Sequence, residues 1–151
     1  LGYGFYQYKG EGRLRVHPKS VQKLKDTIRE VTGRSNGMGI EARRARLNQI
    51  IRGWVNYFKL ADMKNLMQKL DEWVRSRIRM VTWKRWKKVR TRFRNLKSLG
   101  IDEERAWMWA NTRKGYWRTA HSPILTRTLS NALFKQTGYL SFVDCYSGVK
   151  A

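Results

Sequence analysis

The stretch between residues 63 and 99 constrains the fold of this chain more than any other part of the sequence. Apolar residues recur in it mostly three or four positions apart, which is the repeat of one face of an α-helix. They are Leu66, Leu70, Val74, Ile78, Val81, Val89, Phe93 and Leu96. Gly100 then suits a helix end. The spacing predicts one helix over residues 63–99, which would be about 50 Å long if unbroken.

The other elements follow from the same kind of pattern. Alternating apolar residues on both sides of Gly10-Glu11-Gly12 predict a β-hairpin over residues 1–16. Apolar spacing and the start signals Pro18 and Ser122-Pro123 predict four more helices, over residues 18–32, 40–60, 102–111 and 123–136, with a loop over residues 35–39. The tail after Gly138 has no decisive pattern. The expected fold class is mainly α with a short N-terminal β-hairpin, and Gly100 is the expected start of a smaller C-terminal subdomain.

The charge of the chain is strongly unbalanced. It has 33 basic and 11 acidic residues among 151, for a net charge of +22. Such a chain repels itself when compact, and it suits a polyanionic partner. Nucleic acid is the first candidate, and an anionic membrane surface is the second. No apolar run approaches the ~20 residues that span a bilayer, and the mixed indoles and charges of residues 63–99 leave no clean lipid face. The sequence therefore favours nucleic acid as the partner and argues against binding to a membrane.

The basic residues gather in two places. Residues 75–94 hold ten of them and no acid: Arg75, Arg77, Arg79, Lys84, Arg85, Lys87, Lys88, Arg90, Arg92 and Arg94. Like charges so close together destabilise a helix unless something neutralises them. Trp83 and Trp86 lie within the run, and indoles beside cations can stack on bases or sugars. For both tryptophans a position in the core is as well supported as contact with nucleic acid. A second cluster, Arg113, Lys114, Tyr116, Trp117 and Arg118, falls in an expected connector. We predict nucleic-acid contact for both clusters.

The sequence offers no catalytic or metal-binding set. Its acids are scattered, whereas polymerases and nucleases use paired carboxylates to hold Mg²⁺. His17 and His121 have no partner at an informative spacing, and the one cysteine, Cys145, cannot form an internal disulfide. Cysteine usage is typical of an intracellular protein. We therefore expect this chain to have no catalytic residue, no metal site and no cofactor.

Several tryptophan-rich strings carry a resemblance to a known family. They lie at residues 15–23 (RVHPKSVQK), 52–58 (RGWVNYF), 60–63, 70–73, 83–92 (WKRWKKVRTR), 110–117 (ANTRKGYW) and 122–125. Together they span nearly the whole chain, and it resembles the C-terminal part of group II intron reverse transcriptases, which are also maturases. The resemblance implies that residues 1–17 form the last hairpin of the palm. Residues 18–99 would form the three-helix thumb or X (maturase) domain, and residues 100–151 the start of a helical DNA-binding region.

The same resemblance implies a function. Such enzymes copy RNA into DNA, and they help their own intron RNA to fold, splice and move. Their Tyr-x-Asp-Asp motif is not in this chain and would lie upstream of Leu1, so Mg²⁺ is expected only in the parent polymerase domain. The implied partners are group II intron RNA, a template–primer duplex, the missing fingers and palm and, in addition, target DNA. The implied location is the bacterial cytoplasm, in a ribonucleoprotein with the intron RNA.

The string at residues 52–58 divides into two groups. Trp54 and Phe58 lie on an apolar stripe and are expected in the core, while Arg52, Asn56 and Tyr57 are expected to contact RNA. Gly53 inside a helix costs roughly 1 kcal/mol relative to alanine, so it indicates close approach of either another helix or RNA. Two alternatives stay open for the whole chain. One is a free-standing maturase-like splicing factor without polymerase activity, and the other is a basic structural protein such as a ribosomal component.

Overall fold

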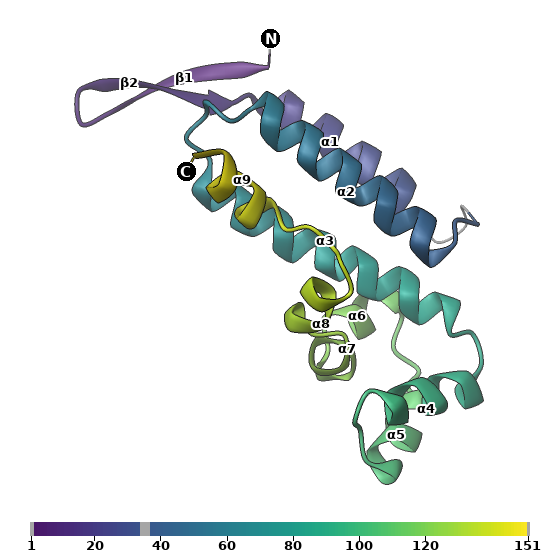
Figure 1. Cartoon of the computed structure of the whole chain (residues 1–151). Coiled ribbons are helices and arrows are strands. Elements are labelled where there is room, and N and C mark those ends of the chain that lie inside the picture. The colour runs from purple at the N-terminus through teal and green to yellow at the C-terminus, as the bar shows by residue number, and fades with distance from the viewer. Residues whose placement is uncertain (1, 34–36, 151) are drawn as a thin grey trace. The chain divides into compact units, whose positions relative to one another are not determined.

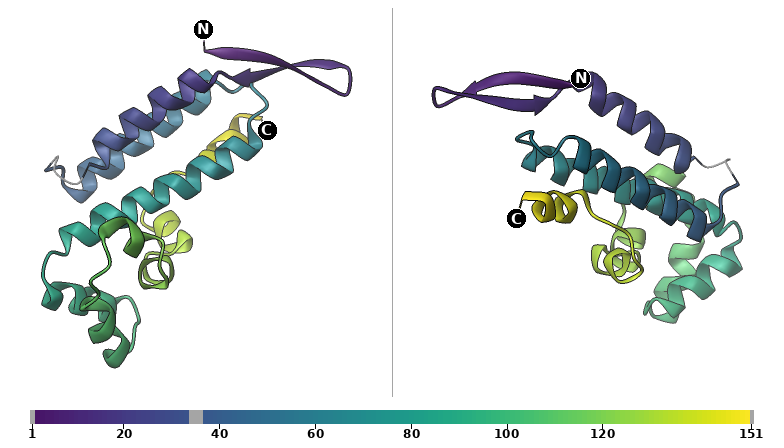
Figure 2. Two further views of the ribbon diagram at one scale, coloured as in Figure 1. Left: turned by 180° about the vertical axis from the view of Figure 1, so that it is seen from behind. Right: turned by 45° about the horizontal axis from the view of Figure 1, so that its top comes forward.

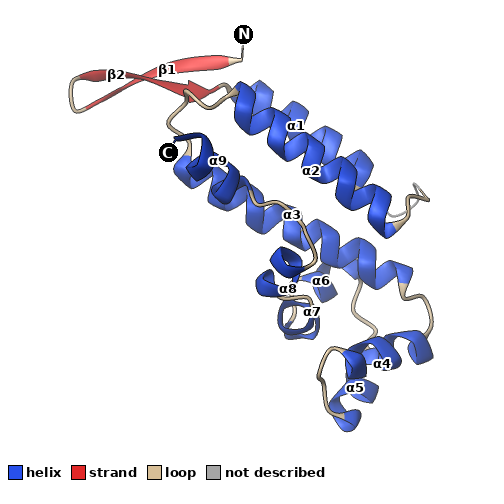
Figure 3. Ribbon diagram, in the orientation of Figure 1, coloured by secondary structure: helices blue, strands red, loops and turns tan. Residues whose placement is uncertain are grey.

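The computed structural model describes residues 2–33 and 37–150. Within these ranges the chain forms a two-stranded hairpin followed by helices (Figures 1 and 3). The elements are β1 (Tyr3–Tyr8), β2 (Glu11–Val16), α1 (Pro18–Val31), α2 (Ile40–Tyr57), α3 (Lys64–Arg85), α4 (Val89–Ser98), α5 (Glu103–Ala110), α6 (Tyr116–Ala120), α7 (Pro123–Thr128), α8 (Asn131–Gln136) and α9 (Phe142–Lys150). The predicted fold class, mainly α with an N-terminal hairpin, is confirmed. The loop predicted over residues 35–39 begins outside the described residues.

The hairpin is antiparallel, and its register pairs Tyr3 with Val16 and Tyr8 with Glu11. Lys9 and Gly10 form the two-residue loop, with φ angles of 50° and 80°. Positive φ at both positions gives a turn whose twist matches that of the strands. The hairpin is held by Asp62, whose carboxylate accepts hydrogen bonds from Tyr6 Oη and from Arg13 Nη1, the latter at 2.9 Å.

The chain divides into two compact units, and each is described by itself. The first unit comprises Leu1–Val74 and Gly138–Ala151, and the second comprises Arg75–Thr137. In the first unit α2 packs against both α1 and α9 (Figure 2). Its core is built from Leu24, Ile28, Leu47, Ile51, Val55, Met67, Leu70 and Phe142. The domain boundaries at residues 17 and 99, which came from the sequence, stay predictions.

The tail after Gly138 folds back onto the first unit. The side-chain amide of Asn48 donates to Gly138 O at 2.8 Å, and its oxygen accepts from Leu140 N at 2.9 Å. Asp71 then accepts hydrogen bonds from Ser141 Oγ, Phe142 N and Val143 N at 2.7, 2.6 and 3.0 Å. This carboxylate therefore satisfies the free N–H groups at the start of α9, as an N-cap does, although it comes from a distant helix.

The single helix predicted over residues 63–99 is wrong, because the chain leaves the helix after Arg85. Lys88 is extended (φ −97°, ψ 147°), and α4 begins at Val89. The apolar stripe that supports the prediction has a gap between Val81 and Val89. Four cations crowd that gap, and like charges at close spacing weaken a helix. Trp83 in the gap is 1% exposed, so its indole is anchored where the helix ends.

The C-terminal half also departs from its predicted elements. The predicted helix over residues 123–136 is two short helices, because Leu129 leaves the helical conformation (ψ 67°). Ser130 starts α8, and its hydroxyl accepts a hydrogen bond from Leu133 N at 3.2 Å. The expected connector between Asn111 and Ser122 contains the short helix α6. In the second unit α4 packs against α5, and α6 against α7.

Candidate nucleic-acid interface

The break between α3 and α4 places a group of basic side chains on the surface of the second unit. Arg85, Lys87, Lys88, Arg90 and Arg94 are exposed. The other predicted residues of the run, Arg75, Arg77, Lys84, Trp86 and Arg92, are half-buried. We call the five exposed cations together with Lys84 the break cluster. Because the helix ends at residue 85, these charges gather around a turn and do not line one continuous helix.

The break cluster is not neutralised from within the described part of the chain. No acidic side chain lies within 4 Å of any of its six cations there. Ion pairs elsewhere in the described residues include Arg13–Glu11, Arg13–Asp62, Arg29–Asp26 and Arg105–Asp102. The N-terminus of α4 adds to the positive field, because its N-cap Lys88 makes no side-chain capping bond. Backbone N–H groups at such an end favour an anion. Phosphate is the anion that this arrangement suits.

Among the predicted residues of the basic run, Arg79 is the one whose side chain is buried, so its position does not favour the predicted contact with nucleic acid. Its side chain is buried, at 7% exposed. Nε donates to Leu129 O at 2.8 Å, Nη2 donates to Asn131 Oδ1 at 3.0 Å, and the guanidinium lies 5.2 Å from the ring centre of Phe134. Burial, with a smaller contribution from Arg75, lowers the pKa of the Arg79 guanidinium. Arg79 thus ties α3 to the α7–α8 junction.

Arg92, a member of the basic run at residues 75–94, packs on Trp83. Its guanidinium sits 4.2 Å from the ring centre of Trp83, and Nη2 donates to Trp83 O at 3.3 Å. Burial lowers the pKa of Arg92, and the charge interaction with Tyr116 opposes that shift. This interaction places Tyr116, at the start of α6, near Arg92 of α4. Among the described residues, Arg92 Nε is buried and has no hydrogen-bond partner.

The second cluster is otherwise open to solvent. Arg113, Lys114 and Arg118 are exposed, and Tyr116 is half-buried. Trp117 is 42% exposed, and its ring lies 4.4 Å from that of His121 in an edge-on arrangement. This cluster has the cation-and-aromatic composition of surfaces that hold a nucleic-acid backbone.

Sequence reasoning missed an exposed aromatic surface on α5. Trp107 is 42% exposed and Met108 63% exposed. Trp107 stacks on Phe93 of α4, with ring centres 3.9 Å apart and an interplanar angle of 16°. The string Trp107-Met108-Trp109 could not reveal which of its members faces solvent, because a short helix next to α4 can turn either side inward.

The remaining predicted residues lie in the first unit, on α2. Arg52, Asn56 and Tyr57 are exposed as predicted, and Tyr57 is 59% exposed. Phe58 is buried, which confirms its expected core position, whereas Trp54 is only half-buried. A Cβ atom added to Gly53 would meet no atom within 4 Å, so close approach of another described helix does not explain this glycine.

Two further findings concern other kinds of site. Over the described ranges, no three side chains from His, Cys, Asp and Glu are grouped so that they could hold a metal ion. Among the described helices, none is long and apolar enough to cross a membrane.

Comparison with known proteins adds the decisive observation. The family described as the group II intron, maturase-specific domain matches residues 21–100. The chain belongs to this family. The matched residues begin in α1 and end at the turn after α4, so the maturase-specific domain includes the break cluster and the motif at residues 52–58. No curated protein matches the chain significantly. The resemblance stated from the tryptophan-rich strings is confirmed, and with it a group II intron maturase role.

Proposed function

We propose that this maturase domain binds group II intron RNA through the break cluster and thereby stabilises the folded intron. The observation that carries the proposal is the break between α3 and α4. It gathers six cations, five of them exposed, without acidic partners in the described residues and beside an uncapped helix N-terminus. Phosphate groups would neutralise this surface. Membership in the maturase family supports a group II intron as the source of those phosphates.

The chemistry of such a site is recognition and not catalysis. A helical RNA presents its phosphates and 2′-hydroxyls on a wide, shallow minor groove, so a protein grips it mainly by shape and backbone contacts. Arginine and lysine side chains around a turn can follow the curved backbone and fix its position without reading sequence. The intron RNA itself would carry out the splicing reaction, and the domain would favour its active fold.

The same surface would serve a polymerase. We propose that the parent protein is a reverse transcriptase, with this chain containing its thumb, and that the break cluster also grips the template–primer duplex during intron mobility. The resemblance of residues 15–23 to the exit from a palm hairpin supports this proposal, as does the hairpin that precedes α1.

A salt titration tests the RNA-binding proposal. The logarithm of the association constant should fall linearly with that of the salt concentration, and each phosphate contact contributes about 0.7 to 0.9 to the slope. The double variant K87Q/K88Q should weaken binding and lower the slope by roughly 1.4 to 1.8 if both lysines touch phosphate. Filter binding to a group II intron RNA measures both quantities.

The control for lost charge is R127Q in the same unit. Arg127 is exposed on α7, outside the break cluster and outside the matched residues. R90Q should lower the slope more than R127Q does. Equal slopes for wild type and K87Q/K88Q would refute the role of the break cluster. Equal affinity for the intron and for an unrelated structured RNA at matched salt would refute specific maturase binding.

A further inference from the structure

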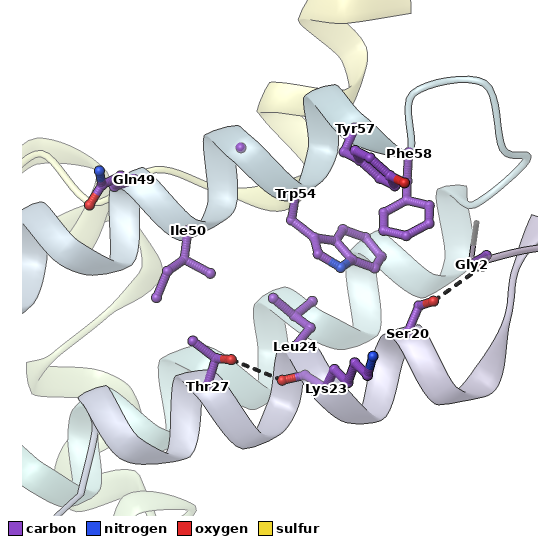
Figure 4. Close-up of a pocket in the computed structure, with 11 residues that line it drawn as sticks. Gly2, Ser20, Lys23, Leu24, Thr27, Gln49, Ile50, Trp54, Tyr57 and Phe58 are labelled. Atoms are coloured by element: carbon purple, nitrogen blue, oxygen red, sulfur yellow. Dashed lines mark hydrogen bonds between the residues drawn. The ribbon is translucent and has the colours of Figure 1, made fainter.

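A groove lies between α1 and α2 in the first unit, away from the break cluster in sequence. It has a volume of about 580 Å³ and is lined by Ser20, Lys23, Leu24 and Thr27 of α1, by Gln49, Ile50, Gly53, Trp54 and Tyr57 of α2, and by Gly2 and Phe58. That volume is within the range of small-ligand sites, roughly 300–1,000 Å³. Figure 4 shows the indole of Trp54 extending from α2 toward α1, with its nitrogen on the side of Leu24.

The aromatic wall of the groove is held in place from behind. The Trp54 ring centre lies 4.7 Å from that of Phe58 and 6.2 Å from that of Phe142, the latter edge-on at 87°. Phe58 and Phe142 are both buried, at 5% and 0% exposed. Tyr57 continues the aromatic surface, with its ring centre 4.7 Å from that of Phe58. A rigid, half-exposed indole of this kind offers a flat surface for stacking.

The polar groups of the groove are mostly donors. In the described ranges, Lys23 Nζ, Trp54 Nε1 and the amide nitrogen of Gln49 have no hydrogen-bond partner, whereas Gln49 Oε1 accepts from Arg46 at 3.1 Å. No acidic residue lines the groove. Such a site suits a ligand with a flat face, several acceptor oxygens and negative charge.

The opening at Gly53 is the second notable feature. No atom lies within 4 Å of the position that a Cβ would take, so nothing in the described packing requires a glycine there. Glycine nonetheless weakens a helix relative to alanine. Its presence in the middle of α2 is explained if the missing side chain leaves room for a ligand that passes over the helix into the groove.

We propose that this groove takes one unpaired nucleotide extruded from the bound RNA. The base would stack on Trp54 beside Tyr57, the Gln49 amide would donate to one of its exocyclic oxygens, and Lys23 would neutralise the adjoining phosphate. Unpaired bases stacked on aromatic side chains are a common means of sequence-tolerant RNA recognition. This inference rests on the proposed function, because it assumes that the domain binds RNA.

Two hairpin RNAs test the inference, one with a fully paired stem and one with a single unpaired uridine in the same stem. Fluorescence anisotropy on the full chain should show about 10-fold tighter binding of the RNA with the unpaired uridine, the effect expected from one stacked base. G53M should lose this preference and keep its affinity for the paired stem, because a methionine side chain would fill the opening while suiting a helix. K23Q should reduce the preference, while K69Q, an exposed lysine outside the groove, should not.

The controls separate this inference from the proposed function. G53A, which adds only a methyl group, checks by circular dichroism that α2 tolerates a side chain at residue 53. Binding of neither RNA would refute the proposed function itself. Salt-dependent binding of both RNAs without preference for the unpaired uridine would overturn only the nucleotide site. A preference that survives in G53M would also overturn it, because the unpaired base would then bind elsewhere.

Crosslinking gives a second, independent readout. With 5-iodouridine at the unpaired position, irradiation should join the RNA to Trp54 or Tyr57, as mapped by mass spectrometry of the digested complex. Crosslinks confined to other aromatic residues, such as Trp107 or Trp117, would overturn the proposal.

Discussion

Replacing Asp71 by alanine should detach the C-terminal helix α9 from the rest of the first unit. The carboxylate is 6% exposed and accepts three hydrogen bonds at the start of α9, from Ser141 Oγ and from the backbone N–H groups of Phe142 and Val143. Loss of an N-cap costs about 0.5–2 kcal/mol. A buried donor left without a partner costs about 1–3 kcal/mol, and here Phe142 N is the buried one. The two effects overlap, so we expect a loss of about 3 kcal/mol.

The assay is urea denaturation combined with amide hydrogen exchange. D71A should lower the free energy of unfolding, and the amides of α9 should lose protection before those of α1 and α2. D71N should lose less, about 1 kcal/mol, because an asparagine oxygen still caps a helix. D144A is the matched control: it removes an exposed acid from the first turn of the same helix. Its cost should not exceed about 1 kcal/mol, the size of a helix-dipole interaction.

Two results would refute the reasoning. A loss below about 0.5 kcal/mol in D71A, with α9 still protected, would mean that Asp71 does not hold the helix. Equal losses in D71A and D144A would mean that the general loss of negative charge from a basic protein, and not the cap, sets the effect.

Two further predictions concern a buried arginine and a half-buried cysteine. R79M should destabilise the second unit by about 2 kcal/mol in urea denaturation, because it removes the donors to Leu129 O and Asn131 while keeping an apolar stem. The salt slope of RNA binding should not change. A lower slope in a fully stable R79M would show that Arg79 touches RNA. Burial raises the pKa of the Cys145 thiol, and Arg52 opposes this shift in part. Near pH 8 a smaller fraction of the thiol is therefore thiolate in the folded chain than in the unfolded chain, so iodoacetamide should alkylate the folded chain more slowly than the urea-unfolded chain. Equal alkylation rates would contradict this.

The sequence was informative wherever a structural feature depends on residues that are close together along the chain. The hairpin, α1, α2 and α5 were all predicted within a few residues, because alternation, helical spacing and start residues act over a few positions. The basic residues around the helix break and the motif at residues 52–58 were also visible, and the family followed from those strings. The exposure of Arg52, Asn56 and Tyr57 could be predicted without tertiary information.

What the sequence left undetermined depends on contacts between distant residues. Arg79 looked like its neighbours in the basic run, and only its packing against α7 and α8 turned it inward. Asp71 gave no sign of capping a helix 71 residues later, and the end of the long helix at Arg85 depends on where Trp83 is anchored. By itself the sequence determined the hairpin and the helices α1, α2 and α5, the charge, and the family of this domain. Only the tertiary structure decided which cations remain exposed, since burial and partners are set by segments far apart in the chain.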